Sequence, residues 1–473
     1  MFKEENLKKT FIILMMLYPL FGIKFFYNSY FTLIQIGLIM ILFIWLLAIN
    51  KSSRKNIKWL IFYEVLLIGY AILHHMNALN FTSLVPGNFN YSALKEILYL
   101  IKLNIPIIFV YILFYLRLNK TEFIKIIKWW IILISGSIVI TNILGISLGS
   151  YSDELIKGNI FTWFNQDFIY RDLASKGYFM YANQISCLLV VLIPFITYFY
   201  LQNKLKLYYL IILMLSLLML GTRVANIGSV LVLFVIVSLY LLFCILKKEK
   251  LERKKVISIF FIIVLYAFLL PFSPTIGRDN IYEYILKENN GETLYASNND
   301  ELLTDINYIK DNYEKKLINK EFITRSYPYQ YDPSFWLNIL NEPEENRADY
   351  RFLEISMVKR VIEINNNKLD FWFGITNSRI QNIFNIERDY ILQYYAFGLI
   401  GFILLIGVYF IIFIKNIIYL IKNFNFCNVC LVSSFALFLV IAYMSGNIMN
   451  QISIFVPLLF IICQNIAKTV DSK

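Results

Sequence analysis

Charged residues are scarce in this sequence. Only 16% of its 473 residues are Asp, Glu, Lys or Arg, whereas 59% are hydrophobic, and the mean hydropathy is +0.61. A soluble protein of this length needs many more polar side chains to cover its surface. The composition therefore excludes a soluble globular protein and favours a protein that lies within a lipid bilayer.

Cysteine and histidine are also rare. The five cysteines all lie outside the long polar segment of the chain, so no disulfide framework is predicted. Cys427 and Cys430 form a lone CxxC pair, which we interpret as small residues at a helix end rather than as zinc ligands. His74 and His75 end a predicted span, where the membrane interface is the simplest interpretation. The sequence predicts no metal or nucleotide cofactor, since it also lacks a glycine-rich phosphate loop.

Long apolar segments are abundant. Each approaches the length of about 20 residues that a helix needs to cross the hydrocarbon core, and none alternates as barrel strands do. The first lacks a cleavage site after it and is interpreted as a retained helix rather than a signal peptide. The pattern predicts an all-α integral membrane protein with about twelve transmembrane helices. The predicted spans are 10–27, 31–49, 58–74, 94–116, 125–147, 179–201, 207–222, 226–246, 256–274, 389–414, 427–445 and 451–468.

The net charge of +12 is concentrated in short loops. Lys and Arg gather at 51–58, 117–128, 204–206 and 247–255, as expected of loops that face the cytoplasm. With the N-terminus in the cytoplasm, all four loops lie on that side, and the even number of spans returns the C-terminus there. The positive charge therefore marks the cytoplasmic loops, which are expected to lie next to anionic lipid. It predicts no nucleic-acid partner.

One large polar loop is predicted between the ninth and tenth spans. We divide the chain into transmembrane helices at 1–274, a partly helical extracytoplasmic loop at 275–386, and transmembrane helices again at 387–473. Apolar residues recur at helical spacing in 302–317 and 352–364, which predicts two amphipathic helices in the loop. A loop of this length in a compact protein is commonly functional.

Three groups of ionisable or polar residues lie in or next to predicted spans, where placing such groups in the membrane costs free energy. Gly221-Thr222-Arg223 joins two spans, and its guanidinium can grip a phosphate or simply snorkel to the interface. Glu387-Arg388-Asp389 opens the tenth span, where a carboxylate can act as a general base or only complement the helix dipole. Arg171, Lys176 and Asn183 lead into the sixth span, and a hydrogen bond to a neighbouring helix is the simpler interpretation of Asn183.

The order of these groups resembles the O-antigen polymerase and ligase superfamily. The likeness covers about residue 171 to the C-terminus and includes a G-x-F-x-x-x-N entry to a span, an arginine turn, an amphipathic loop helix, a glycine segment and a closing signature. Glu387 stands where the ligases of this family carry a histidine, and the long loop has no histidine, which favours a polymerase. The matching segments are Gly177–Asn183, Gly221–Arg223, Arg351–Val358, Phe371–Asn377 and Glu387–Gly401.

The resemblance implies a membrane glycosyltransferase of the bacterial cytoplasmic membrane. Such a polymerase joins lipid-linked oligosaccharide repeat units into a capsule, an exopolysaccharide or O-antigen. It moves glycan from polyprenyl diphosphate to an acceptor sugar hydroxyl at the outer leaflet. Its partners would be polyprenyl-diphosphate-linked oligosaccharides, membrane lipids, a flippase and a chain-length regulator.

The chemistry of the implied glycosyl transfer indicates which candidate residues are catalytic and which bind substrate. A diphosphate leaving group needs fixed cations, and an acceptor hydroxyl needs a base. The catalytic candidates are Glu387, Asp389 and Arg223, and the substrate-binding candidates are Arg388, Arg351, Arg171, Lys176 and Asn183.

Alternatives to a polymerase stay open at this point. A ligase would move finished glycan to another acceptor. A flippase or another transporter of lipid-linked oligosaccharides would commonly show inverted repeats, and none is found in the sequence. A purely structural membrane protein is disfavoured by Arg223 and by the Glu387 cluster.

Overall fold

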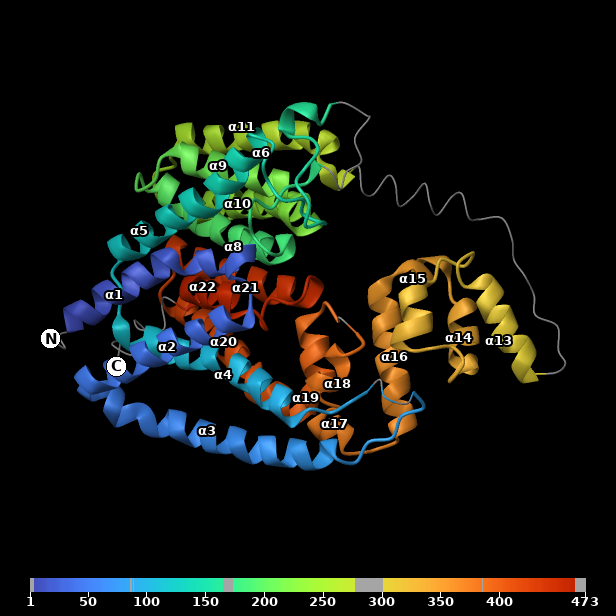
Figure 1. Cartoon of the computed structure of the whole chain (residues 1–473). Coiled ribbons are helices and arrows are strands. Elements are labelled where there is room, and N and C mark those ends of the chain that lie inside the picture. Colours follow the sequence, from blue (N-terminus) through green and yellow to red (C-terminus); the bar gives the residue numbers. More distant parts are fainter. Residues whose placement is uncertain are drawn as a thin grey trace. The chain divides into compact units, whose positions relative to one another are not determined.

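The computed structural model describes residues 4–85, 87, 89–164, 173–276, 301–384 and 386–463 (Figure 1). These residues form helices, and among them the only β-type pairings are three isolated bridges. Within the described residues, nine helical stretches are long and apolar enough to cross a membrane, and two shorter apolar helices accompany them. The predicted all-α membrane protein is therefore confirmed, whereas the number of spans stays a prediction.

The chain packs as two compact units. Unit 1 draws on Met1–Lys58, Lys102–Asn280 and Val408–Lys473, and unit 2 on Trp59–Ile101 and Ile281–Gly407. Two of the boundaries fall within α3 (Lys51–Ala78) and α4 (Ala93–Leu116), so each of these helices contributes to both units. This division follows packing, whereas the division predicted from the sequence follows the side of the membrane and stays a prediction.

Unit 1 is built around α8 (Ala182–Leu201). Its apolar window is 94% buried, because α9, α10, α21 and α22 all pack against it. A helix that is apolar on every side belongs in such a central position. The other helices of unit 1 are α1 (Glu4–Leu17), α2 (Ser29–Ile49), α5 (Lys120–Trp130), α6 (Ser137–Ile143), α9 (Leu207–Leu220), α10 (Ser229–Lys247), α11 (Arg253–Leu269), α20 (Gly407–Lys422), α21 (Phe426–Met444) and α22 (Ile452–Ile462).

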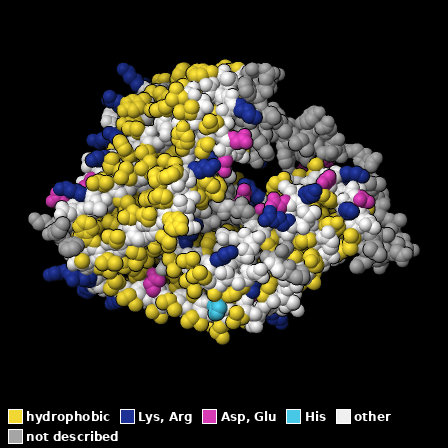
Figure 2. Space-filling view, in the orientation of Figure 1, with side chains coloured by type: hydrophobic (Ala, Val, Ile, Leu, Met, Phe, Trp, Pro, Cys, Tyr) yellow, Lys and Arg dark blue, Asp and Glu magenta, His cyan; other side chains and the backbone are white. Residues whose placement is uncertain are grey.

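The surface of unit 1 is largely apolar. Figure 2 shows hydrophobic side chains over much of the face in view. Ile41 on α2, Leu231 on α10 and Phe261 on α11 are 60%, 57% and 68% exposed. A soluble monomer rarely exposes so wide an apolar surface, whereas lipid covers it at no cost. The exposed faces of these helices therefore agree with a membrane environment.

Unit 2 contains shorter helices together with parts of α3 and α4. Trp336 and Tyr327 lie fully inside it, and Trp336 Nε1 donates a hydrogen bond to the Tyr327 carbonyl at 2.8 Å. The two amphipathic helices predicted for the loop correspond to α13 and α16. The helices that lie wholly in unit 2 are α13 (Glu301–Asn312), α14 (Pro333–Leu340), α15 (Glu344–Ala348), α16 (Tyr350–Asn365), α17 (Asp370–Phe373), α18 (Asn377–Gln381) and α19 (Asp389–Leu405).

The spans predicted at 10–27 and 389–414 are less regular than the sequence indicated. The span predicted at 10–27 is α-helical only to Leu17, because Pro19 lacks the backbone N–H that a continuing helix requires, and 3-10 turns follow. The span predicted at 389–414 is interrupted at Gly398, which has φ +65° and ψ −173°, and α19 ends at Leu405 before α20 begins.

The interruption at Gly398 is where α17 meets α19. A Cβ on Gly398 would collide with the Phe373 backbone, and a Cβ on Gly374 would collide with the Ala396 carbonyl. Both glycines have positive φ, at +65° and +76°, so glycine is needed for conformation and for space. The backbone N–H groups of Ile375 and Thr376 then donate to carbonyls of α19 at 2.9 and 3.0 Å.

Candidate functional site

The turn at Gly221-Thr222-Arg223 is rigidly held in unit 1. Gly221 has φ +67°, and a Cβ on it would lie 2.7 Å from the Ala174 side chain. The Thr222 hydroxyl is buried, shares a hydrogen bond with Ser186 at 2.8 Å and accepts one from the backbone of the following turn. This framework fixes the backbone from which Arg223 extends as an exposed side chain. An exposed guanidinium on a fixed turn can bind an anion with little loss of conformational freedom.

The segment before α8 positions the other candidates of unit 1. The Lys176 side chain is only 5% exposed, and Nζ donates to the Ser152 carbonyl at 3.0 Å and lies 3.7 Å from the Asp153 carboxylate. Burial lowers the pKa of Lys176, and the Asp153 charge opposes part of that shift. These contacts give Lys176 a structural role in its loop. Arg171 lies outside the described residues.

Asn183 is the second residue of α8 and is half-buried. The interhelical hydrogen bond expected here is made instead by the next residue, since Gln184 Nε2 donates to the Asn447 carbonyl at 2.9 Å. Lys102, which the sequence analysis did not single out, donates to Gln451 Oε1 at 3.5 Å in the same unit. Both bonds fix the turn between α21 and α22.

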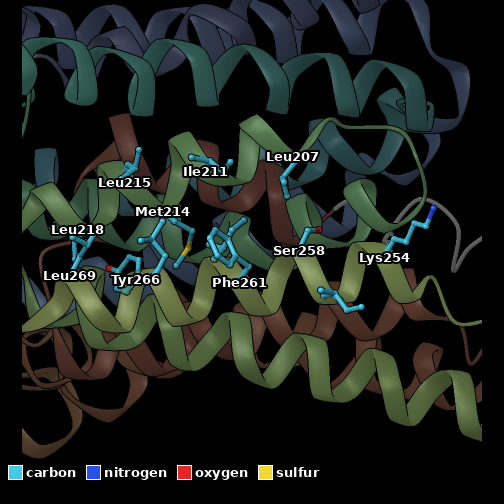
Figure 3. A pocket seen from close by; sticks show the side chains of 13 residues that line it. Leu207, Ile211, Met214, Leu215, Leu218, Lys254, Ser258, Phe261, Tyr266 and Leu269 are labelled. Carbon is cyan, nitrogen blue, oxygen red and sulfur yellow. The ribbon is translucent and has the colours of Figure 1, made fainter.

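An apolar groove runs between α9 and α11 in unit 1 (Figure 3). Its volume is about 440 Å³, and it extends from the start of both helices to their ends. At its far end the Tyr266 hydroxyl accepts a hydrogen bond from Ser229 at 2.9 Å, and Leu218 lies three residues before Gly221. The side chains that line it include Leu207, Met214, Leu218, Phe261, Tyr266 and Leu269. A groove of this length and polarity fits a hydrocarbon chain.

In unit 2 the structure brings together two candidates from separate motifs. Arg351 Nε and Nη2 both donate to Glu387 Oε2, at 3.1 and 2.7 Å. The two side chains are 35% and 39% exposed, so a ligand can reach both. The backbone N–H of Arg351 also donates to Asp349, which caps α16. The pair thus joins α16 to the start of α19.

The two residues that follow Glu387 are more deeply buried than Glu387 or lie in a different environment from it. Asp389 is the first residue of α19 and fully buried, where a carboxylate complements the positive end of the helix dipole. Arg388 precedes it as the N-cap residue and is half-buried, and its buried Nε makes no hydrogen bond to any described residue. The predicted cluster therefore divides into an accessible carboxylate, Glu387, and a buried one, Asp389.

A buried polar network in unit 2 was missed by the sequence analysis. His74, predicted at the interface, is 1% exposed and lies 3.0 Å from Glu96 Oε1 and 2.6 Å from the Phe373 carbonyl. The ring is enclosed between α4 and the α17 segment, and these contacts were not predicted, whereas the position of His74 at the membrane interface stays a prediction. Glu96 also accepts the backbone N–H groups of Asn377 and Ser378 at 3.0 and 2.9 Å, so it caps α18.

Arg379 completes this network. Its guanidinium donates to the carbonyls of Phe89, Ile375 and Ala78, at 3.2, 3.3 and 2.7 Å, and its side chain is buried. Burial lowers its pKa to about 10. Because these donors already bind backbone carbonyls, Arg379 holds the fold of unit 2 rather than a ligand. Within the described residues, no group of three or more His, Cys, Asp and Glu side chains is placed to hold a metal ion.

The sequence matches the model of a known protein family. The sequence model described as "O-antigen ligase like membrane protein" matches residues 5–469, which is nearly the whole chain and includes every candidate residue. The comparison with curated proteins finds no match.

Proposed function

Since the chain belongs to the family of O-antigen ligase-like membrane proteins, we propose that it polymerises lipid-linked oligosaccharide repeat units into a surface polysaccharide. The family supports a glycan-transfer role at a membrane, and the polymerase reaction is our proposal within it. The donor is a growing glycan on polyprenyl diphosphate, and the acceptor is a sugar hydroxyl of a lipid-linked repeat unit. The product is a capsule, an exopolysaccharide or O-antigen, made at the outer leaflet of the bacterial cytoplasmic membrane.

The observation that carries this proposal is the accessible pair of Arg351 and Glu387. In the proposed step, Glu387 takes the proton of the acceptor hydroxyl while that oxygen bonds to the anomeric carbon of the donor. The bond from that carbon to the diphosphate breaks, and polyprenyl diphosphate leaves with the electron pair. Arg351 orients Glu387 before the substrate arrives and can then bind the anionic leaving group. Asp389 is less suited as the base because it is fully buried.

Arg223 and the apolar groove are assigned to the lipid-linked substrate in unit 1. A polyprenyl tail is a long hydrocarbon, and the groove between α9 and α11 is open to lipid along exposed side chains such as Phe261. The groove ends beside the turn that carries Arg223, so a tail in the groove places its diphosphate near that guanidinium. In unit 2, Arg388 is assigned a contact with the leaving diphosphate.

The ligase stays a second candidate because the family description is ligase-like. Glu387 in the position where the resemblance expects a histidine favours the polymerase. A flippase and a chain-length regulator are proposed as partners, because the substrate must first reach the outer leaflet and the product has a controlled length.

Substitution in cells that carry the full pathway tests the proposal. We expect Glu387→Gln or Arg223→Ala to lower polymer formation roughly 100-fold, because the first removes the proposed base and the second removes a proposed contact of the lipid diphosphate. Single repeat units on lipid should accumulate, as seen by gel analysis of extracted glycans. Glu363→Gln, which changes an exposed carboxylate on α16, is the control. Normal polymer length in both variants would refute the roles, and accumulation of long lipid-linked polymer would indicate a ligase.

A further inference from the structure

A polar cavity lies within unit 2, apart from the Arg351–Glu387 pair. Its volume is about 820 Å³, it is open to solvent, and three stretches of chain line it: the one leading into α4, the π-helical turn η7 (Phe322–Ser326), and the end of α18. Small-molecule sites commonly have volumes of about 300–1,000 Å³, so this cavity has room for a short oligosaccharide rather than a single ion. Its polar lining includes Asn90, Lys95, Glu321, Arg325, Gln381 and Asn382.

Hydrogen bonds hold the wall of the cavity in place. Asn382 Nδ2 donates to the Asn90 carbonyl at 3.1 Å, and Lys95 Nζ donates to Asn382 Oδ1 at 3.5 Å. On the other side, Ser326 Oγ donates to the Ile383 carbonyl at 3.1 Å, and the adjacent Phe384 is 2% exposed. The cavity is therefore formed by anchored backbone segments, and ligand binding would require little reordering of the backbone.

The charges and amides of the lining define the ligand chemistry. Lys95 and Arg325 are two cations, and Glu321 is one carboxylate, which leaves an excess of one positive charge. Glu321 pairs with Arg325 at 3.3 Å, but with these side chains 65% and 83% exposed the pair is weak. Among the described residues, the one partner of Lys95 Nζ is the neutral amide of Asn382. Side-chain amides next to a cation match the hydroxyls and the carboxylate of an acidic sugar.

We propose that this cavity is a binding subsite for an acidic sugar residue, such as a uronic acid, of the glycan on which the protein acts. The assignment rests on the proposed function for its biological meaning, although the binding itself does not require turnover. The wall residue Phe384 lies three positions before Glu387 in the chain, so a bound glycan is held in the same unit as the proposed base. Lys95 binds the carboxylate, and Gln381 and Asn382 bind the hydroxyls.

Saccharide binding to the full chain in detergent tests this subsite. The probe is a tetrasaccharide of alternating glucuronic acid and N-acetylglucosamine, and its carboxyl-reduced, neutral form is the comparison. By saturation-transfer NMR and calorimetry we expect the acidic form to bind roughly tenfold more tightly, as a charged hydrogen bond contributes. Lys95→Gln should abolish this difference. Lys359→Gln, which removes an exposed lysine of α16 away from the cavity, should preserve it.

The outcomes separate this subsite from the polymerase proposal. Equal binding of the acidic and neutral forms, no binding of either, or equal losses in the two lysine variants would overturn the subsite. Displacement of the acidic form by an equal concentration of sodium acetate would show that only a free anion is recognised, and would overturn it too. Glu387→Gln should bind the probe as the unchanged protein does. Normal polymer from Glu387→Gln would refute the role of Glu387 as the base and leave the binding result standing.

Discussion

At the scale of single residues, Asp332 shows how a charge is held inside unit 2. Its side chain is 3% exposed and accepts hydrogen bonds from Arg360 Nε at 2.7 Å, the Tyr327 hydroxyl at 2.9 Å and the Ser334 hydroxyl at 2.9 Å. Burial alone would raise the pKa of Asp332, but these donors outweigh burial and hold the pKa below its usual value. The carboxylate also caps α14, so it ties that helix to α16.

The lowered pKa of Asp332 predicts a loss of stability in acid. A depressed carboxyl pKa contributes stability that is fully present above the unfolded value of about 3.9 and is lost as the pH falls through the folded value. Asp332→Asn should lower the stability of α14 and α16 by about 2 kcal/mol at pH 7, because Arg360 loses its buried partner. Amide hydrogen exchange at pH 7 should then be roughly 30-fold faster in these helices than in the unchanged protein. This difference between the two proteins should shrink as the pH falls below about 3.9.

Asp311→Asn is the control for this change, since Asp311 is an exposed carboxylate in the same unit. Equal exchange rates in the two variants would show that the ion pair does not stabilise these helices.

The sequence identified the exposed candidates better than the buried ones. Arg351 and Glu387 belong to separate motifs, and the structure pairs them. The bond between Glu96 and the backbone of Ser378 spans 282 positions, and no local pattern signals such a contact. The available hint was an acidic residue, Glu96, placed in the first turn of an apolar helix. Folding satisfies such a group through contacts that only the tertiary structure defines.

At the scale of helices, apolar length was predictable and helix breaks were not. Most predicted spans coincide with described helices because length and hydropathy fix where a chain can cross lipid. The hydropathy of an apolar stretch is the same whether its helix is continuous or interrupted. The break at Gly398 depends on the distant Gly374, whose backbone packs against it.

This contact predicts that Gly398 accepts no side chain. In Gly398→Ala the new methyl group would collide with the Phe373 backbone, and alanine also disfavours the positive φ. We expect unit 2 to lose about 3 kcal/mol of stability from overpacking and strain together, with α17 displaced from α19. Thermal unfolding in detergent and polymer formation in cells are the measurements.

Gly407→Ala is the matched control, because its nearest neighbour to an added Cβ is the Ile403 side chain at 3.7 Å. An effect of Gly398→Ala no larger than that of the control would show that α19 adapts to the methyl group.

At the scale of the whole molecule, the distribution of charge predicts which segments face each side of the membrane. Basic residues gather in short loops such as 247–255, and the long segment 275–386 holds more acidic than basic residues. Short basic loops remain in the cytoplasm, whereas long polar segments cross regardless of their charge. The proposed reaction requires 275–386 on the outside, because it contains Arg351, adjoins Glu387 and must meet glycan at the outer leaflet.

Labelling of single cysteines in intact cells tests this topology. In a variant without the five natural cysteines, Lys310→Cys and Lys359→Cys should react with a membrane-impermeant maleimide, because both lie in the long segment. Lys250→Cys should react only after the cells are lysed, since its loop is basic and short. The reverse pattern would place Glu387 on the side where nucleotide sugars rather than finished lipid-linked repeats are found. The proposed polymerase would then lack its substrate, whatever the geometry of its site.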